Sequence, residues 1–281
     1  MSGVDLGQSL KDRDALPACG AARCADRDAF QAPPPSTAAR RWLIINADDF
    51  GISGGTNAGI IAAHGCGAVT STSLMVRWPA AARASETARR HPKLSVGLHL
   101  DLGEWAYRRG QWETVYSVVP LDDAEAVRKE IHAQLEAFRA LMGKDPTHLD
   151  SHQHVHRDEP VRSLLVELGQ ALGVPVRSCT PYIHYCGDFY GQTGKGEPLP
   201  EAVTADALVQ VLLRLPAGIT ELACHPGCDM SLATMYCRER WLEVRTLSNS
   251  AVHEAIDALR VELISFADVR SLIKLQSVAS G

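Results

Sequence analysis

From residue 41 onward, the chain alternates short apolar runs with longer stretches in which apolar residues recur at steps of three or four. The short runs have the length and composition of strands. The longer stretches have the period of helices that bury one face. The predicted strands cover residues 42–47, 69–76, 94–100, 147–152, 174–179, 219–225 and 261–266.

The clearest predicted helix covers residues 122–142. Its apolar positions lie three or four residues apart, which places them on one face of a helix. These positions are Val127, Ile131, Leu135, Phe138 and Met142. Further helices are predicted at residues 55–64, 79–90, 159–172, 204–214 and 238–258.

Strands that alternate with helices predict parallel β/α units. Their number favours an α/β fold of the distorted, TIM-like (β/α) barrel type, with mostly parallel strands, over a doubly wound sheet. No GxGxxG motif follows the first predicted strand, which also weighs against a dinucleotide-binding domain. We expect a single barrel domain over residues 41–276. Residues 1–40 are polar, Ala-rich and Pro-containing, so we expect a disordered N-terminal extension and linker there.

Composition narrows the possible partners and location. The 281 residues are 46% hydrophobic, an ordinary globular value, and the formal net charge is −5, so neither nucleic acid nor an anionic membrane surface is expected as a partner. No run reaches the roughly 18 apolar residues of a membrane span, and the first residues lack the order of a signal peptide. We expect a cytoplasmic protein whose eight cysteines are free thiols. A zinc site that uses Cys224 and Cys228, which flank His225, is an alternative.

Acidic or imidazole side chains stand at the ends of four predicted strands. In parallel β/α folds, the carboxyl ends of the strands gather catalytic groups at one rim. A single histidine there is usually a structural residue, but the coincidence at four strands indicates a site. The residues are Asp48 and Asp49, His99, Asp150 and His152, and His225.

The neighbouring carboxylates of Asp48 and Asp49 repel each other and lose water, which destabilises the protein unless a cation or proton compensates. Two histidines and one carboxylate form a three-ligand site for a divalent metal with open positions for water and substrate. Such a metal lowers the pKa of bound water and polarises a carbonyl oxygen. A second carboxylate then suits a general base, and a histidine across the site suits a general acid.

The HxHxH pattern at residues 152, 154 and 156 places three imidazoles on one side if the segment stays extended. A chain that turns out of the strand breaks this alignment. The roles of His154 and His156 therefore stay open between the metal site, its rim and solvent.

Four ordered motifs resemble those of the YdjC-like carbohydrate deacetylase family, and the similarity runs from about Trp42 to Ile273. The motifs are NADDFG at 46–51, GLHL at 97–100, HLDSHQHVH at 148–156 and HPG at 225–227. The resemblance implies a distorted (β/α) barrel, often a homodimer, that hydrolyses the N-acetyl group of an N-acetylglucosamine-type sugar.

The resemblance also implies a role for each matching residue. Asp49, His99 and His152 are expected to bind one divalent metal ion. Asp48 matches the catalytic base of the family, and His225 matches its general acid. Ligand type admits Mg²⁺ or Zn²⁺, with Co²⁺ or Fe²⁺ also possible.

Aromatic residues follow His99 on a predicted Gly-containing loop, and their faces could stack on a sugar ring or pack the loop onto the barrel. We take Trp105, Tyr107 and Trp112, together with His154, as weak candidates for binding an acetylated amino-sugar substrate.

Two other functions are alternatives. One is a different metal-dependent barrel hydrolase, such as an amidase, cyclic-amide hydrolase or phosphoesterase. A two-metal version of it would recruit Asp150 and His154. The other is a non-catalytic metal- or sugar-binding protein, which would need neither a base nor an acid.

Overall fold

The computed structural model describes residues 40–230, 232 and 234–279. The extension predicted at 1–40 therefore lies outside the described residues, apart from Arg40. Within the described part, no helix is long and apolar enough to cross a membrane.

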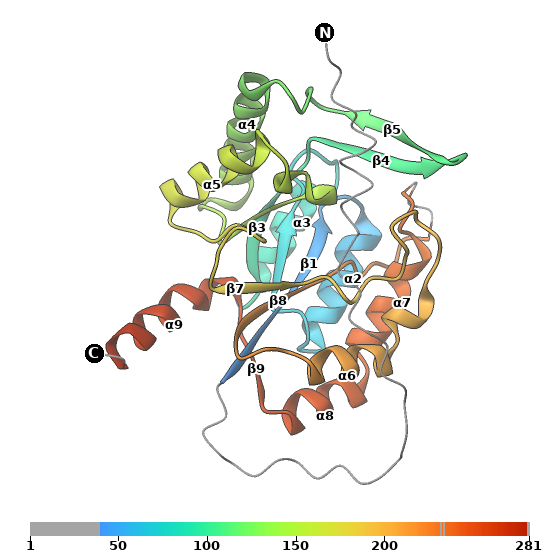
Figure 1. Cartoon of the computed structure of the whole chain (residues 1–281), viewed down its shortest axis with the longest axis vertical. Helices are drawn as coiled ribbons and strands as arrows, with labels where there is room; N and C mark the ends of the chain where they lie inside the picture. Colours follow the sequence, from blue (N-terminus) through green and yellow to red (C-terminus); the bar gives the residue numbers. More distant parts are fainter. Residues whose placement is uncertain (1–39, 231, 233, 280–281) are drawn as a thin grey trace.

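A seven-stranded sheet forms the centre of the molecule, and all of its strand pairings are parallel (Figure 1). Its order is β6-β3-β2-β1-β8-β7, and β9 pairs with β1 off this path. The long central strand β1 is buried along nearly its whole length, which explains its continuous apolar run. The strands are β1 (Arg41–Phe50), β2 (Ser71–Leu74), β3 (Ser95–Leu100), β6 (Leu149–Ser151), β7 (Ile183–Cys186), β8 (Gly218–Cys224) and β9 (Val261–Leu263).

Helices surround this sheet, and the C-terminal helix α9 extends away from the body in Figure 1. In α4, the five apolar positions predicted from the sequence are all buried. Asp123 caps its N-terminus, and Gly143, with φ of 70°, ends it. The helices are α2 (Gly54–Gly65), α3 (Ala81–Arg90), α4 (Ala124–Met142), α5 (Val161–Leu172), α6 (Ala205–Leu213), α7 (Arg238–Leu247), α8 (Ser250–Ala258) and α9 (Phe266–Ala279).

The fold is α/β with the distorted barrel that the sequence predicts. The strand predicted at 174–179 is reduced to one parallel bridge between Val176 and Leu149 of β6. Pro175 has no N–H to donate, and Cys179 turns back to bond the Val176 carbonyl. β7 then starts at Ile183, on the opposite edge of the sheet. One short segment therefore joins the two edges of an incomplete barrel.

Two further elements differ from the prediction. The segment expected as a loop after His99 is an antiparallel hairpin of β4 (Gly103–Arg108) and β5 (Gln111–Ser117). The helix predicted at 238–258 is divided into α7 and α8, because the side chain of Asn249 accepts the Ala251 N–H and caps a new helix.

Candidate active site

The site lies at the carboxyl end of β1, where Asp48 and Asp49 enter the interior. Their side chains are only 4% and 1% exposed. Asp49 has a left-handed backbone with φ of 65°, and the register of β1 against β2 shifts between Ala47 and Phe50. Asp tolerates this conformation better than most residues. The irregularity lets the two adjacent carboxylates contact different partners.

Strand pairing brings the other groups to the same rim. Ala47 of β1 lies opposite Cys224 of β8, so the residues that follow them, Asp48 and His225, are neighbours. His99 of β3 lies opposite Asp150 of β6. The rim predicted from the strand ends is therefore present in the structure.

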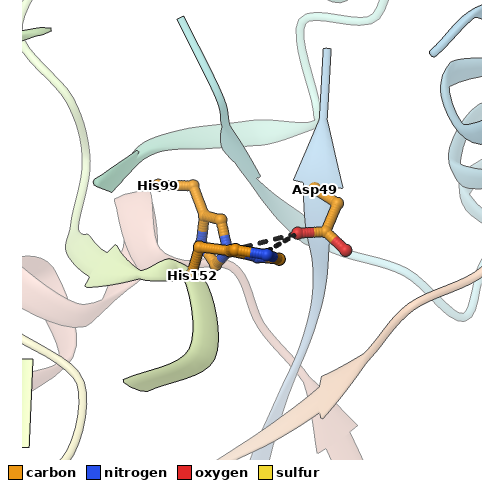
Figure 2. A group of neighbouring side chains, drawn as sticks. All are labelled: Asp49, His99 and His152. Atoms are coloured by element: carbon orange, nitrogen blue, oxygen red, sulfur yellow. Dashed lines mark hydrogen bonds and ion pairs between the residues drawn. The ribbon is translucent and has the colours of Figure 1, made fainter. Parts of the chain in front are cut away.

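Asp49, His99 and His152 converge on one point, as Figure 2 shows. The distance from Asp49 Oδ1 to His99 Nε2 is 3.3 Å, and that to His152 Nδ1 is 3.1 Å. One ligand atom from each residue lies within 4.8 Å of the others, and all three residues are buried. A carboxylate oxygen and two imidazole nitrogens in this arrangement can hold a divalent cation.

Hydrogen bonds orient these candidate ligands. His99 Nδ1 lies 2.8 Å from Asp150 Oδ1, which directs Nε2 toward Asp49. Burial lowers the pKa of His99, but Asp150 and Asp49 outweigh it and raise that pKa to about 10. The arrangement thus favours positive charge beside Asp49, which is what a divalent cation supplies.

Arg240 of α7 holds the second oxygen of Asp49. Its Nη2 lies 2.5 Å from Asp49 Oδ2, and the side chain is only 2% exposed. Burial raises the pKa of Asp49, but Arg240, His152 and His99 together outweigh it and hold that pKa well below its usual range. Asp49 is therefore ionised, with Oδ1 left to face the two histidines.

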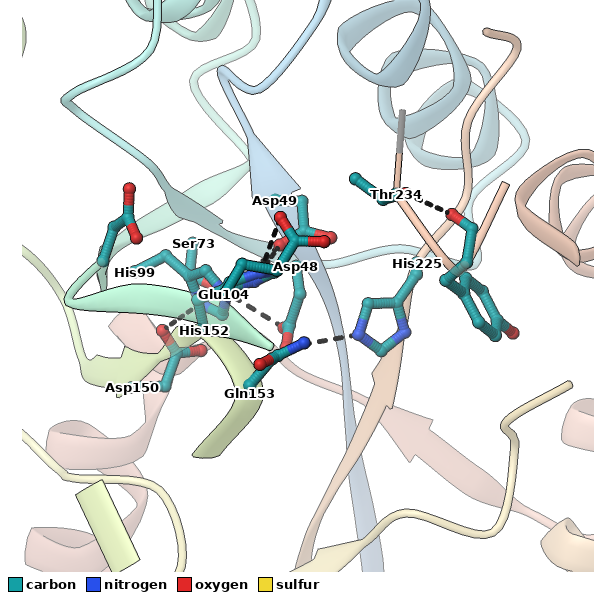
Figure 3. Close-up of polar contacts among 12 residues, drawn as sticks. Asp48, Asp49, Ser73, His99, Glu104, Asp150, His152, Gln153, His225 and Thr234 are labelled. Atoms are coloured by element: carbon teal, nitrogen blue, oxygen red, sulfur yellow. Dashed lines mark hydrogen bonds and ion pairs between the residues drawn. The ribbon is translucent and has the colours of Figure 1, made fainter. Parts of the chain in front are cut away.

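Asp48 is held by Arg177. It also lies beside His225, as Figure 3 shows. Two guanidinium nitrogens of Arg177 lie 2.6 and 2.7 Å from the Asp48 oxygens, and Asn46 Nδ2 donates to Oδ1 at 2.8 Å. Burial raises the pKa of Asp48, but Arg177, with His99 and His225, outweighs it and keeps that pKa well below its usual range. His225 Nε2 lies 3.8 Å from Asp48 Oδ2.

Arg177 also contacts two further carboxylates. It lies 2.8 Å from Asp150 Oδ2 and 2.6 Å from Glu221 Oε1. One fully buried guanidinium therefore bridges Asp48, Asp150 and Glu221. Because Asp150 also contacts His99, Arg177 links the surroundings of Asp48 to those of the candidate metal ligands.

His225 is positioned by α7 and by aromatic rings. Its backbone N–H donates to Glu243, which also accepts a hydrogen bond from the Tyr236 hydroxyl. The rings of Tyr190 and Tyr236 lie 5.5 and 5.3 Å from the imidazole centre. The side chain of His225 is 19% exposed, so it can meet a substrate from solvent.

The chain turns out of the strand at η1 (His152–Arg157), a kinked 3-10 segment, so the alignment of the three histidines expected for an extended chain does not form. Gln153 and His154 have left-handed φ angles of 49° and 55°. His154 Nε2 lies 3.1 Å from the Tyr185 hydroxyl, and the turn directs His156 Nδ1 to Ser151 Oγ at 2.7 Å. Of the three histidines, His152 is the one that contacts Asp49.

The aromatic candidates lie on the β4–β5 hairpin. Trp105 is 6% exposed and belongs to the main hydrophobic core. Tyr107 and Trp112 pack edge to face, with ring centres 5.6 Å apart. The Tyr116 hydroxyl donates to Asp101 at 2.8 Å. Packing of the hairpin accounts for these contacts.

The two cysteines beside His225 do not converge with it. Cys224 is buried, and its Sγ donates to the Asn46 carbonyl at 3.4 Å, while Cys228 is exposed. Neither cysteine belongs to a candidate metal-binding group among the described residues.

Sequence reasoning missed the buried charges behind the rim. Arg177 and Glu221 lie within apolar runs that were predicted as strands, and ionisable residues are rarely buried in such runs without a partner. The buried positions Arg240 and Glu243 in α7 are three residues apart and share one face. In both pairs, Arg177 with Glu221 and Arg240 with Glu243, a charged residue at a position that faces the core was the sequence signal for a buried ion-pair network.

Comparison with known proteins identifies the family. Residues 42–258 match the sequence model described as YdjC-like protein. A carbohydrate deacetylase of Geobacillus stearothermophilus is 32% identical over 253 residues, which cover 83% of this chain and 99% of that protein. A chitooligosaccharide deacetylase of Serratia marcescens is 31% identical over 268 residues, with 82% and 99% covered.

Solved structures share the fold. A crystal structure of an Enterococcus faecalis protein named for cellobiose-phosphate cleavage superposes with a TM-score of 0.65 and 25% identity, covering 82% of this chain and 99% of that one. A family 4 carbohydrate esterase from Streptomyces lividans gives a TM-score of 0.50 at 15% identity, covering 81% and 93%. The second likeness concerns the fold alone.

Proposed function

This chain belongs to the YdjC-like protein family, and from that premise we propose that it is a metal-dependent carbohydrate N-deacetylase. It removes the N-acetyl group from an N-acetylglucosamine-type sugar or oligosaccharide and releases acetate. The observation that carries the proposal is the convergence of Asp49, His99 and His152 beside the Asp48–His225 pair. The names of the relatives, carbohydrate and chitooligosaccharide deacetylase, support the substrate class.

Asp49, His99 and His152 would hold one divalent cation. The two imidazoles suit Zn²⁺, Co²⁺ or Fe²⁺, and a carboxylate with water ligands also admits Mg²⁺. When bound, the cation supplies positive charge that polarises the acetyl carbonyl and lowers the pKa of water.

Asp48 and His225 move the proton. Asp48 takes a proton from the attacking water, and His225, 3.8 Å away, delivers a proton to the departing nitrogen. Burial lowers the pKa of His225 to about 4, so its imidazole is neutral at pH 7. The proton that reaches the nitrogen is therefore the one that the pair removed from water. The C–N bond breaks, the hydroxyl joins the acetyl carbon, and acetate and a free amine leave.

The role of Arg177 follows from its contacts with Asp48. A carboxylate oxygen has two lone pairs, so Asp48 can accept from Arg177 and still receive a proton from water. The two hydrogen bonds from the Arg177 guanidinium fix the orientation of the Asp48 carboxylate next to His225. The same two hydrogen bonds lower the basicity of Asp48, which favours rapid transfer of the proton from Asp48 to His225.

The contacts of Asp150 and His154 weigh against a two-metal hydrolase. Asp150 is engaged by Arg177 and His99, and His154 lies against Tyr185. The positive charge that faces Asp150 is thus the guanidinium of Arg177, in the place where a second metal ion would have to bind. A non-catalytic binding protein is less well supported, because binding alone does not need the Asp48–His225 pair.

Acetate release tests the proposal. Metal-stripped protein is incubated with N,N′-diacetylchitobiose and a panel of other N-acetylated sugars, with Zn²⁺, Mg²⁺, Co²⁺ or Fe²⁺ returned singly. We expect acetate only where an ion has been returned. If an ion binds tightly and no sugar releases acetate, the substrate class is wrong, and cyclic amides and phosphoesters become the next substrates. Light scattering on the same preparation tests the homodimer that we include in the proposal.

A further inference from the structure

The imidazole of His152 has one nitrogen in the candidate metal site and one outside it. Nδ1 lies 3.1 Å from Asp49 Oδ1. Nε2 is buried and has no hydrogen-bond partner among the described residues. A carboxylate oxygen, Glu104 Oε2, lies 3.9 Å from that nitrogen. Figure 3 shows Glu104 in this region of the site.

A histidine that binds a metal through one nitrogen carries its proton on the other. If Nδ1 of His152 is the ligand, Nε2 is an N–H group, and a buried N–H without an acceptor destabilises the protein. The second histidine of the site already has such an acceptor, because its Nδ1 lies 2.8 Å from Asp150. Glu104 offers the corresponding group to His152.

The β4–β5 hairpin fixes Glu104 in this place. The carboxylate residue is 4% exposed. The next residue, Trp105, is tied to Gln153 by two 2.9 Å hydrogen bonds, one from its backbone N–H and one to its carbonyl. Gln153 directly follows His152, so these hydrogen bonds connect the residue after Glu104 to the residue after His152. The register of β4 against β5 shifts between Glu104 and Trp105, and such an irregularity changes the direction in which the Glu104 side chain points.

We propose that Glu104 is a positioning residue that accepts the Nε2–H of His152 and holds its Nδ1 toward the cation. The hairpin thus belongs to the metal centre as its outer support. The inference rests on the metal site of the proposed function. It assigns Glu104 no contact with the reacting atoms.

Metal binding without turnover tests this role. Co²⁺ is titrated into metal-stripped wild type, Glu104→Ala and Glu104→Gln, and the dissociation constant and the visible absorption of bound Co²⁺ are recorded. Glu113→Gln, on β5 of the same hairpin, is the matched control. Loss of an acceptor behind a liganding histidine weakens metal binding by roughly 10–100-fold. We expect that loss in the alanine variant, with a changed Co²⁺ spectrum.

The glutamine variant separates positioning from direct ligation. Its amide oxygen still accepts an N–H, so Glu104→Gln should bind Co²⁺ several-fold more tightly than Glu104→Ala. Thermal unfolding of the metal-free proteins should give similar midpoints, because the role concerns the bound cation. Equal losses in both variants, or a control that loses as much, would overturn the inference.

Different results would contradict the metal site and the positioning role of Glu104. If wild type binds Co²⁺ and both Glu104 variants bind it equally well, the inference is wrong and the metal site stands. If wild type binds neither Co²⁺ nor Zn²⁺, the metal centre of the proposed function is contradicted, and the inference falls with it.

Discussion

Arg177 donates two hydrogen bonds to Asp48, over nitrogen–oxygen distances of 2.6 and 2.7 Å. The two residues are 129 positions apart in the chain. The guanidinium also contacts Asp150 and Glu221, and its side chain is fully buried. A single cation therefore contacts three carboxylates behind the rim. His99 also faces Asp150, and burial raises the pKa of Glu221 to about 7, so Arg177 does not balance this negative charge alone.

Removal of this cation should strongly destabilise the protein. Arg177→Met leaves buried carboxylates without their partner, and breaking a buried pair in this way costs about 3–5 kcal/mol. Urea unfolding monitored by circular dichroism measures the change. Arg128→Met is the control, because the ion pair of Arg128 with Glu167 is exposed and should contribute less than about 1 kcal/mol. Similar losses in both variants would contradict the role of Arg177.

The two neighbouring histidines of η1 should behave differently toward metal. His152→Ala removes a candidate ligand, so Zn²⁺ or Co²⁺ affinity should fall by at least about tenfold. His154→Ala removes a ring that contacts Tyr185, so affinity should stay within a few-fold of wild type. Calorimetric titration of metal-stripped proteins gives both constants. A larger loss in His154→Ala would show that the ligand set is wrong.

Gly59 of α2 sets the position of the HPG segment. A Cβ atom at Gly59 would lie 2.5 Å from Gly227 Cα, two residues after His225. Gly59→Ala should therefore displace this segment, destabilise the protein by about 1–3 kcal/mol and reduce turnover. Gly54→Ala, in the same helix, meets no atom within 4 Å and is the control. The explanation fails if the two variants have equal stability and activity.

Acid should destabilise the protein through buried neutral histidines. Burial lowers the pKa of His148 from 6.5 to about 3. Between these values the unfolded chain binds a proton that the folded chain does not, so stability falls as pH falls through this window. His148→Gln removes that group, and its stability relative to wild type should rise by roughly 1.4 kcal/mol per pH unit below 6.5. Urea unfolding at several pH values tests this, and parallel profiles would contradict it.

The rim of the site could be predicted because parallel strands end at the same edge. Asp49, His99 and His152 each follow or end a predicted strand, and the structure brings them together. Pairing of β1 with β8 likewise brings His225 to Asp48. The pattern of apolar residues along the chain locates the strand ends, and the strand ends in turn locate the residues of the rim.

The buried cations could not be predicted in the same way. Arg240 meets Asp49 across 191 positions of the chain, and that pairing depends on how α7 packs against the barrel. The hairpin was missed because its turn uses Arg109 and Gly110, both with positive φ, in place of the Asn-Gly or Asp-Gly pair that usually marks such turns. Glu104 therefore had no predicted position near His152.

The dependence of acetate release on metal equivalents tests the central claim most directly. Zn²⁺ is titrated into metal-stripped protein, and acetate release from N,N′-diacetylchitobiose is followed for wild type and Asp48→Asn. The account predicts that the rate rises linearly to one equivalent and then stays constant. Asp48→Asn should bind the same equivalent with a rate lower by roughly 10²-fold or more. A rate that needs two equivalents, or an Asp48→Asn variant with wild-type turnover, would contradict it.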